Sequence, residues 1–522
     1  MDFLSRERTI AGPGFNRWLV PPAALAIHLS IGMAYGLSVF WKPLSQMIGI
    51  TQSAPDDWRI STVSLTFSIA IFFLGSSAAV FGRWLERVGP RKAGVAAACC
   101  WGGGFLIAAL GARSHQIWLI WLGLGVIGGC GLGLGYISPV STLIKWFPDR
   151  RGLATGMAIM GFGGGAMIGA PLGDRLMRHF ATPTSVGVWQ TFVVLGIVYF
   201  LAMMAGAFGY RVPPADWKPT GWTPKPEAKS MVTTHNVHVD VAWKTPQFWA
   251  LWGVLCMNVS AGIGVLAMAS PLIQEMFGGK LIGIPATLAQ LTADQKLEVA
   301  SIAAGFTGLL SLANIVGRLG WASLSDAIGR KRTYMIFFAL GAVMYALVPS
   351  AGRLGLLPAF VAIFVVILTM YGGGFATIPA YLADIFGTRF VGAIHGRLLT
   401  AWSAAGIVGP VVVNYIREFE IKAGVPRESV YDVTMYVLAS MLIAGVVCNY
   451  LVRPVAEKWL IKDENPSVLH AGASWWIRPA IASAQIGQWR LDTTSILAWL
   501  AVGIPICWGA GITLSRALVL FQ

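Results

Sequence analysis

Apolar residues gather in long runs along the whole chain, and short polar segments separate them. Each run approaches the roughly 20 residues that an α-helix needs to cross a bilayer. The runs cover residues 20–41, 60–81, 93–112, 116–139, 152–172 and 188–209 in the first half and 247–270, 299–321, 333–350, 357–381, 395–416 and 431–452 in the second. A thirteenth run, 494–514, stands apart. The pattern predicts an all-α membrane protein with two six-helix halves and one extra C-terminal transmembrane helix.

Composition supports a lipid environment. Only 12% of the 522 residues are charged and 56% are apolar, whereas about 25% of the residues of a soluble domain are charged. All six cysteines fall inside or at the edge of apolar runs, so we expect no disulfide framework. The first run is too long for a signal-peptide core, and we interpret it as a retained span.

The formal net charge of +15 is a topology signal rather than a sign of nucleic-acid binding. Basic residues cluster in alternate loops, at Arg83, Arg87, Arg91 and Lys92, at Lys145, Arg150 and Arg151, at Arg330, Lys331 and Arg332, and at Lys218, Lys225, Lys229 and Lys244. Loops rich in Lys and Arg stay in the cytoplasm. We therefore expect a multi-pass protein of the bacterial inner membrane with a cytoplasmic N-terminus, a periplasmic Gln522 and no nucleic-acid partner.

The two sets of six runs repeat each other at an offset of 240 residues. The matches include Glu86 with Asp326, Gly89 with Gly329, Arg91-Lys92 with Lys331-Arg332, and Pro139 with Pro379. The stretch 211–246 is polar and proline-rich, which favours a linker. We divide the chain into a six-helix half (1–210), a cytoplasmic linker (211–246), a second half (247–452) and a connector with the thirteenth helix (453–522). Such a pseudo-two-fold repeat places a site between the halves near mid-membrane.

The fifth run carries glycines at four-residue spacing, Gly161, Gly165, Gly169 and Gly173. One face of this helix is therefore nearly flat and permits a close approach of another backbone. Two interpretations stay open. The face packs closely against a neighbouring helix as a static contact, or the same face also slides as part of a moving interface.

One arginine lies where a charge is costly. Arg318 falls within run 299–321, and Asn314 precedes it by one turn. A charge at membrane depth costs about 2.5–3.5 kcal/mol on insertion scales, so a small anion in transit is one explanation. Snorkelling toward the nearby helix end, close to Asp326, is the other. His28, in the first run, is either a proton carrier or a packing residue.

The sequence shows no recognisable motif for nucleotide binding, metal binding or catalysis. It contains no G-x-x-x-x-G-K-[ST] phosphate loop, no cluster with metal-ligand spacing and no convincing nucleophile–base set in the loops. We therefore expect no enzyme activity, no cofactor and no metal. A membrane sensor that does not transport is the rival interpretation, and the lack of a large soluble output domain disfavours it.

The loop between the second and third runs resembles the signature of the major facilitator superfamily. It reads Gly82-Arg83-Trp84-Leu85-Glu86-Arg87-Val88-Gly89, with Glu in place of the usual Asp, and the second half repeats it as Asp326, Gly329 and Arg330. The resemblance implies the major facilitator fold and alternating access. Under it, Gly82, Glu86, Arg87, Gly89, Asp326, Gly329 and Arg330 are candidate gating residues. A simple topology anchor is the alternative.

Two longer stretches resemble the oxalate/formate antiporter family. They are Gly131 to Tyr136 followed by Lys145 to Gly156, and Asn314-Ile315-Val316-Gly317-Arg318. The resemblance implies a small carboxylate as substrate and assigns its binding to the matching arginine, Arg318. Related monocarboxylate carriers have Asp where this chain has Asn314. The aromatic lining of the family's cavity matches Tyr136, Tyr371 and Phe375, and Tyr35 is a further candidate.

The chain departs from that family in the eleventh run. Trp402 stands where oxalate carriers have a lysine, and it becomes a further lining candidate. One arginine matches a monoanion, so we expect a monocarboxylate such as formate, lactate or pyruvate, carried by exchange or with protons, by a protein that is a monomer. Oxalate:formate exchange is the alternative. The run 494–514 resembles the family's single-span small subunit, and a helix lying on the membrane surface is the other interpretation.

Overall fold

The computed structural model describes residues 3–50, 52–214, 217–222, 231–233, 235–461 and 492–517. Within these residues, thirteen helices are long and apolar enough to cross a membrane. They coincide with the thirteen predicted runs, so the all-α fold with its two sets of six spans and one extra helix is confirmed. Gln522, the prolines and lysines of 223–230 and most of the connector lie outside the described residues.

The first half begins with two 3₁₀ turns, η1 (Arg6–Thr9) and η2 (Arg17–Leu19). Its first span combines α1 (Val20–Ile31), the 3₁₀ segment η3 (Gly32–Phe40) and α2 (Trp41–Leu44). The next spans are α3 (Ile60–Val88), α4 (Pro90–Arg113), the composite of α5 (Ile117–Ile120), π-helical η4 (Trp121–Ile127) and α6 (Gly128–Trp146), then α7 (Arg151–Phe180) and α8 (Val188–Gly209). Proline opens α1 and α4, where its missing N–H would have no helical partner anyway.

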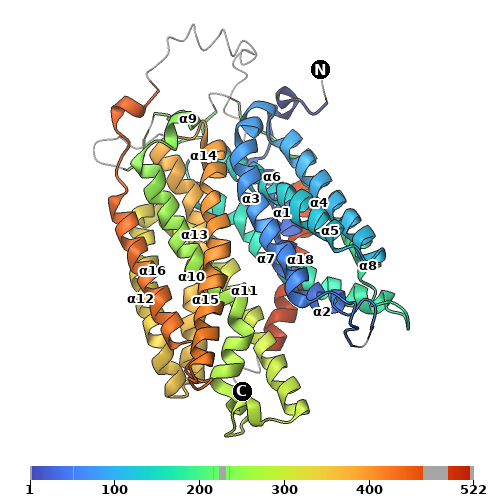
Figure 1. The fold of residues 1–522 in the computed structure, drawn as a ribbon. Coiled ribbons are helices and arrows are strands. Elements are labelled where there is room, and N and C mark those ends of the chain that lie inside the picture. The colour runs from blue at the N-terminus through green and yellow to red at the C-terminus, as the bar shows by residue number, and fades with distance from the viewer. Residues whose placement is uncertain are drawn as a thin grey trace.

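The second half follows a short helix of the linker, α9 (Val239–Ala242). Its spans are α10 (Pro246–Phe277), α11 (Ala293–Ile328), α12 (Arg330–Arg353), α13 (Leu357–Phe386), the pair α14 (Val391–Leu398) and α15 (Thr400–Lys422), and α16 (Asp432–Leu451). Short 3₁₀ turns, η5 (Gly278–Ile282), η6 (Leu288–Gln290) and η7 (Glu457–Trp459), join or follow them, and α18 (Thr493–Ala517) is the last helix. The two sets of six form adjacent bundles (Figure 1).

The repeated glycines end corresponding helices. Gly89 terminates α3 with φ of +87°, and Gly329 terminates α11 with φ of +89°. An L side chain rarely adopts this conformation, so glycine is the residue that lets the chain turn directly into α4 and α12. The end of the bundle that carries Gly89 and Gly329 is called the basic end below, because the basic loops lie there.

The glycine face of α7 packs within its own half. A Cβ at Gly161 would lie 2.9 Å from that of His28 in α1, and one at Gly173 would lie 2.9 Å from Phe40 in η3. Other glycines of α7 meet the second half, since a Cβ at Gly156 would lie 2.9 Å from the Arg318 carbonyl oxygen. The four-residue stripe therefore serves close packing against the first span, and a role in a sliding interface stays a prediction.

Part of the linker packs against the basic end. The Thr233 amide donates to the carbonyl of Asp384 at 2.8 Å and the Val237 amide donates to that of Phe386 at 2.9 Å. Asp240, in α9, forms ion pairs with Arg83 of the first half and Arg397 of the second. The hydrogen bond from Arg397 is the main reason why the pKa of Asp240 is lowered. The boundaries 210, 246 and 452 stay predictions.

Candidate functional site

Arg318 is buried between the two bundles. Its relative exposure is 0%, so the snorkelling interpretation is wrong. The guanidinium donates from Nε to Oδ1 of Asn314 at 3.0 Å and from Nη1 to the Ile159 carbonyl of α7 at 2.9 Å. Among the described residues, none accepts a hydrogen bond from the remaining nitrogen, Nη2. The cation is thus held in place with one donor group left over.

The charge of Arg318 is not balanced by a carboxylate, since no acidic residue in the described part of the chain forms an ion pair with it. Its Cζ lies 5.3 Å from the ring centroid of Phe375 and 5.9 Å from that of Phe162. Such cation–π contacts contribute about 2 kcal/mol when desolvated, whereas burying an ion costs several kcal/mol. An anion bound here would supply the missing counter-charge.

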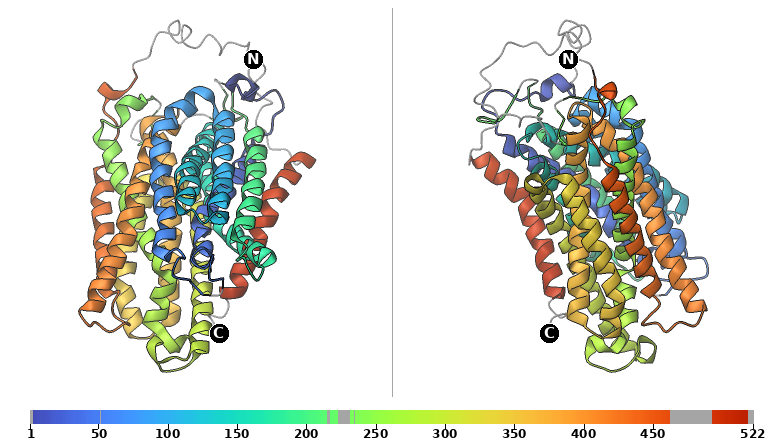
Figure 2. Two further views of the ribbon diagram at one scale, coloured as in Figure 1. Left: turned by 45° about the vertical axis from the view of Figure 1, so that its right-hand side comes forward. Right: turned by 90° about the vertical axis from the view of Figure 1, so that its left-hand side faces the viewer.

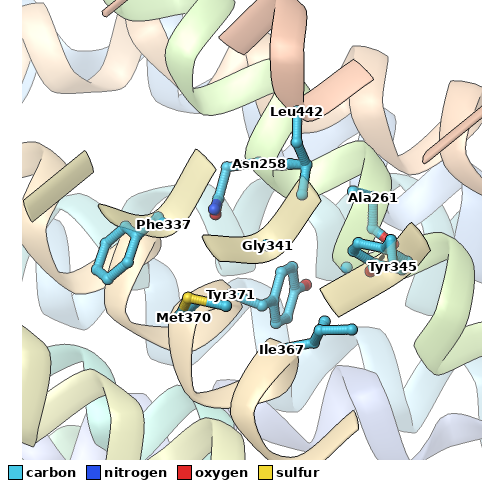
Figure 3. A pocket seen from close by; sticks show the side chains of 10 residues that line it. Asn258, Ala261, Phe337, Gly341, Tyr345, Ile367, Met370, Tyr371 and Leu442 are labelled. Carbon is cyan, nitrogen blue, oxygen red and sulfur yellow. Dashed lines mark hydrogen bonds between the residues drawn. The ribbon is translucent and has the colours of Figure 1, made fainter. Parts of the chain in front are cut away.

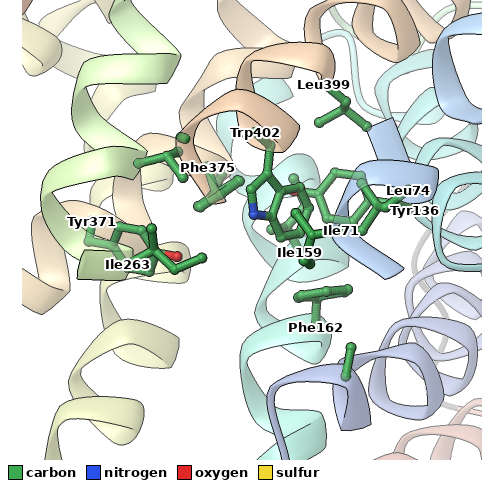
Figure 4. Packing of buried hydrophobic residues seen from close by; sticks show 14 of the residues in the cluster. Ile71, Leu74, Tyr136, Ile159, Phe162, Ile263, Tyr371, Phe375, Leu399 and Trp402 are labelled. Carbon is green, nitrogen blue, oxygen red and sulfur yellow. The ribbon is translucent and has the colours of Figure 1, made fainter. Parts of the chain in front are cut away.

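A cluster of aromatic rings lies beside this cation and contacts it through Phe162 and Phe375, with Trp402 of α15 at the centre of the cluster (Figure 4). The Trp402 ring centroid lies 4.6 Å from that of Phe375, 5.2 Å from those of Tyr136 and Phe162, and 6.3 Å from that of Tyr35. Phe375 comes from α13, Tyr136 from α6, Phe162 from α7 and Tyr35 from η3. The cluster therefore combines rings from both halves and excludes water from the space between them.

Two polar groups of the cluster resemble Nη2 of Arg318, because each is a buried donor without an acceptor among the described residues. The Tyr136 hydroxyl and the Trp402 Nε1–H are buried without a partner among the described residues. Each such donor costs roughly 1–3 kcal/mol when it stays unsatisfied. A carboxylate accepts several hydrogen bonds at once, so it is the kind of group that unpaired buried donors such as these suit.

The Tyr35 and Tyr371 hydroxyls lie 3.2 Å apart and join the two halves beside the cluster. Tyr371 also lines a small cavity of about 10 Å³ inside the second half, together with Asn258, Ala261, Gly262, Phe337, Gly341, Tyr345, Ile367, Met370 and Leu442 (Figure 3). That volume suits about one water molecule. The cavity is far smaller than the 300–1,000 Å³ typical of a ligand pocket, so it is not a substrate pocket in this conformation.

Glycine makes room for the arginine and for its partner. A Cβ at Gly163 would lie 3.1 Å from Nε of Arg318, and one at Gly372 would meet the side chain of Asn314. Side chains at these two positions would displace the groups that hold the cation. The local sequence of α7 and α13 therefore fits the buried arginine on α11.

At the basic end, Glu86 of the first half contacts the start of α14 in the second. It forms an ion pair with Lys145 at 2.9 Å and accepts a hydrogen bond from the Gly392 amide at 3.2 Å. A carboxylate is favourable at a helix N-terminus, where unpaired N–H groups and the helix dipole attract it. Gly82 packs directly against the Ala393 backbone. These contacts hold the halves together.

Asp326 makes the corresponding contact in the opposite sense. It accepts hydrogen bonds from the amides of Gly152 at 2.8 Å and Leu153 at 3.0 Å, at the start of α7. Arg330 of its own half also pairs with it. Each acid of the repeated motif thus binds the N-terminus of a helix in the other half, and the basic end is closed by two related contacts.

Sequence reasoning missed three residues of these networks. Asp384 pairs with Arg330 at 3.2 Å and with Arg151 of the first half at 2.8 Å. Phe162 contacts Arg318. It is the only aromatic residue in the glycine-rich fifth run, and this isolation could have marked it as a candidate in the sequence. His395 of α14 and His28 of α1 flank Tyr136, with ring-centroid distances of 5.8 and 5.3 Å.

The structure brings together the predicted residues Arg318, Asn314, Tyr35, Tyr136, Tyr371, Phe375 and Trp402 between the halves. At the basic end, Glu86 lies in one contact between the halves, and Asp326 with Arg330 lies in the other. Gly82 packs against Ala393, and Gly89 and Gly329 end α3 and α11. Arg87 is different, because its side chain is exposed and takes no part in either network. Lys145, rather than Arg87, pairs with Glu86 in this conformation, and a gating role for Arg87 stays a prediction.

Two known transport proteins are similar to this chain in sequence. The oxalate:formate antiporter of Oxalobacter formigenes is 26% identical over 398 residues, which cover 76% of this chain and 83% of the relative. The apicoplast pyruvate carrier 1 of Toxoplasma gondii is 26% identical over 403 residues, which cover 68% of this chain and 70% of the relative.

A solved structure shares the fold. The transporter FucP, crystallised in its outward conformation, superposes with a TM-score of 0.58 at 13% identity over 84% of this chain and 100% of its own. The family model of the Major Facilitator Superfamily matches residues 14–293 and 277–521. By these matches, the fold expected from the repeated motif is confirmed, and the chain belongs to the Major Facilitator Superfamily.

Proposed function

We propose that this protein is a secondary active transporter that carries a small monocarboxylate by alternating access, and that Arg318 binds the carboxylate. The observation that carries the proposal is the buried guanidinium with no carboxylate partner and an unused Nη2. A planar guanidinium binds a carboxylate through two parallel hydrogen bonds. Asn314 orients it, while Tyr35, Tyr136, Tyr371, Phe375 and Trp402 enclose the substrate.

The single cation favours a monoanion over oxalate. Trp402 stands where the resembling oxalate carriers have a lysine, and its indole supplies a neutral donor in place of a charge. A second carboxylate in this ring-lined space would lack a cation of its own, which is costly in a low-dielectric site. Formate, lactate and pyruvate meet the requirement. The similarity to an oxalate:formate antiporter and to a pyruvate carrier supports this substrate class.

Transport coupled to protons is the second mode that a specific observation favours. His28 and His395 are buried on either side of Tyr136, and both nitrogens of each ring lack partners among the described residues. A carboxylate bound to Arg318 would offset the charge of this cation, and an imidazole beside Tyr136 is then the candidate proton carrier. Without such use of protons, the protein exchanges one carboxylate for another.

We infer that the basic end faces the cytoplasm in a bacterial inner membrane, with the linker 211–246 on the same side and α18 crossing to the periplasm. The support is the concentration of Lys and Arg in the loops at that end. Glu86, Asp326, Arg330 and Asp384 then act as a cytoplasmic gate that is closed in this conformation. We expect the protein to work as a monomer without a cofactor.

The proposal is tested by counterflow in proteoliposomes. Vesicles are loaded with unlabelled formate, lactate, pyruvate, acetate or oxalate, and accumulation of an external labelled monocarboxylate is measured with and without an imposed pH gradient. We expect monocarboxylates to drive counterflow and to compete with one another, and oxalate to compete poorly at neutral pH. Strong inhibition by oxalate would contradict the monocarboxylate assignment. If a pH gradient accelerates uptake of an acid into vesicles that contain no exchangeable carboxylate, the transport is proton symport.

A further inference from the structure

The last helix presents two faces of different chemistry. Its buried residues are Ser495, Val502, Gly509 and Thr513, which follow a helical spacing of seven, seven and four positions. Its exposed face carries Ile496, Leu497, Leu500, Ile504 and Leu514. Small residues on the buried face permit close packing between membrane helices, and the aliphatic face suits lipid. The sequence of α18 is thus built to dock lengthwise on the bundle, as Figure 2 shows.

Both halves contribute to the docking surface, the first mainly through α1 and α7 and the second through α11. Near the basic end, the Asn16 side-chain amide donates to the Ser495 hydroxyl at 2.9 Å. Further along, a Cβ at Gly509 would lie 3.0 Å from the Met167 carbonyl oxygen of α7. At the same level, the Arg175 guanidinium lies over the Trp508 ring at 5.0 Å. The helix is therefore attached to the first half at both of its ends.

In the second half, α18 contacts α11 near the end of the bundle opposite the basic end. A Cβ at Gly308 of α11 would lie 3.0 Å from Cγ2 of Thr513 and 3.9 Å from its Cβ. By contrast, α7 and α11 approach each other through their basic-end halves, where Gly156 and Gly163 meet Arg318. The two bundles thus contact each other directly, through α7 and α11, near the basic end. Toward the opposite end, α18 lies against both of these helices.

We propose that α1, α7 and α11 form a docking surface for a single membrane-spanning helix, that α18 is its occupant, and that its docking favours the conformation with a closed basic end. Opening the basic end requires α7 to rotate against α11, and the rocking of the halves changes their spacing at the opposite end. A helix fixed to α7 and touching α11 there must yield. This inference does not depend on the identity of the substrate.

A cross-link tests the contact. The Cβ separation of 3.9 Å at positions 308 and 513 falls within the range for disulfides, so Gly308→Cys with Thr513→Cys should oxidise readily in a background without the native cysteines. The readout is maleimide labelling of Ala393→Cys, which packs beside Gly82 and becomes accessible only when the basic end opens. Purified protein in nanodiscs gives access from both sides and needs no substrate.

Labelling at position 393 is measured before oxidation of the 308–513 pair, after it, and again after reduction. We expect oxidation to slow labelling about tenfold and reduction to restore it. The control is a disulfide within one half, between Gly253→Cys and the retained Cys448, whose Cβ atoms would lie 3.4 Å apart. It should leave labelling unchanged. Failure of the 308–513 pair to cross-link, or equal labelling in both states, would overturn the proposal.

A substitution tests the docking itself. Gly509→Leu places a side chain against the α7 backbone and should push α18 outward, which should raise labelling at position 393 about tenfold. Gly511→Leu is the matched control, because a Cβ at Gly511 meets nothing within 4 Å. Equal labelling of the two variants would show that docking of α18 does not bias the gate. A protein inactive toward every carboxylate leaves both tests intact.

Discussion

Replacing Asp326 with asparagine should open the basic end. The carboxylate accepts hydrogen bonds from the amides of Gly152 and Leu153 at 2.8 and 3.0 Å, and both bonds cross from one half to the other. Its pairing with Arg330 stays within the second half, so it persists in either conformation. Among the contacts of Asp326, only the two bonds to the start of α7 therefore favour the closed state over the open one.

The size of the effect follows from those two bonds. Asparagine retains one acceptor oxygen but loses the charge that suits a helix N-terminus, and its amide cannot accept the second N–H. A hydrogen bond to a charged group contributes about 1.5–3 kcal/mol, and a charge at a helix N-terminus about 0.3–1 kcal/mol. A net loss of about 1.5–3 kcal/mol corresponds to roughly a 10- to 150-fold shift toward the open state.

The assay is the rate of maleimide labelling of Ala393→Cys in nanodiscs, with and without Asp326→Asn. Asp174→Asn is the control, because among the described residues Asp174 forms an ion pair only with Arg178, one turn along the same helix, and it should change labelling little. A labelling rate of the Asp326→Asn variant within twofold of its parent would refute the reasoning. An equal rise in the control would point to general destabilisation instead of gating.

Three further changes probe the site and the linker. Gly163→Ala should raise the KM for the carboxylate several-fold, because the new Cβ would lie 3.1 Å from Nε of Arg318, whereas Gly103→Ala, which meets nothing within 4 Å, should not. Trp402→Lys should shift competition in the counterflow assay toward oxalate by adding a second cation, and unchanged selectivity would count against that role. Because the pKa of Asp240 is lowered, its ion pairs stabilise the fold above the unfolded value near 3.9 and weaken as pH falls below it. Thermal unfolding should show that Asp240→Asn lowers Tm more at pH 7 than at pH 3, and an equal loss at both would contradict this.

Much of the architecture could be predicted from the sequence because the bilayer imposes a length and a polarity on each span. The thirteen runs, the offset of 240 and the position of Arg318 all follow from that constraint. The acid of the repeated motif was recognisable as well. Its partners were not, since the amides of Gly392 and Gly152 carry no side-chain signal and the contacts depend on how the two bundles dock.

The remaining differences also arise from docking between helices. A four-residue glycine spacing predicts a flat face but not which neighbour covers it, and the stripe at Gly161 faces α1 rather than the second half. Phe162 and His395 belong to the central cluster because α7 and α14 cross at particular heights. Arg87 points outward because its position on α3 lies about a quarter turn away from the side that Glu86 presents to the second half.

The most direct test of the central claim is uptake of a labelled monocarboxylate by the Arg318→Ala variant in proteoliposomes. Removing the charge should abolish uptake, a loss of at least about 100-fold, because the substrate then lacks its buried counter-charge, while labelling at position 393 shows that the variant is folded. Arg318→Lys should stay impaired, since an ammonium lacks the planar fork. Near-normal uptake by the alanine variant would contradict the account.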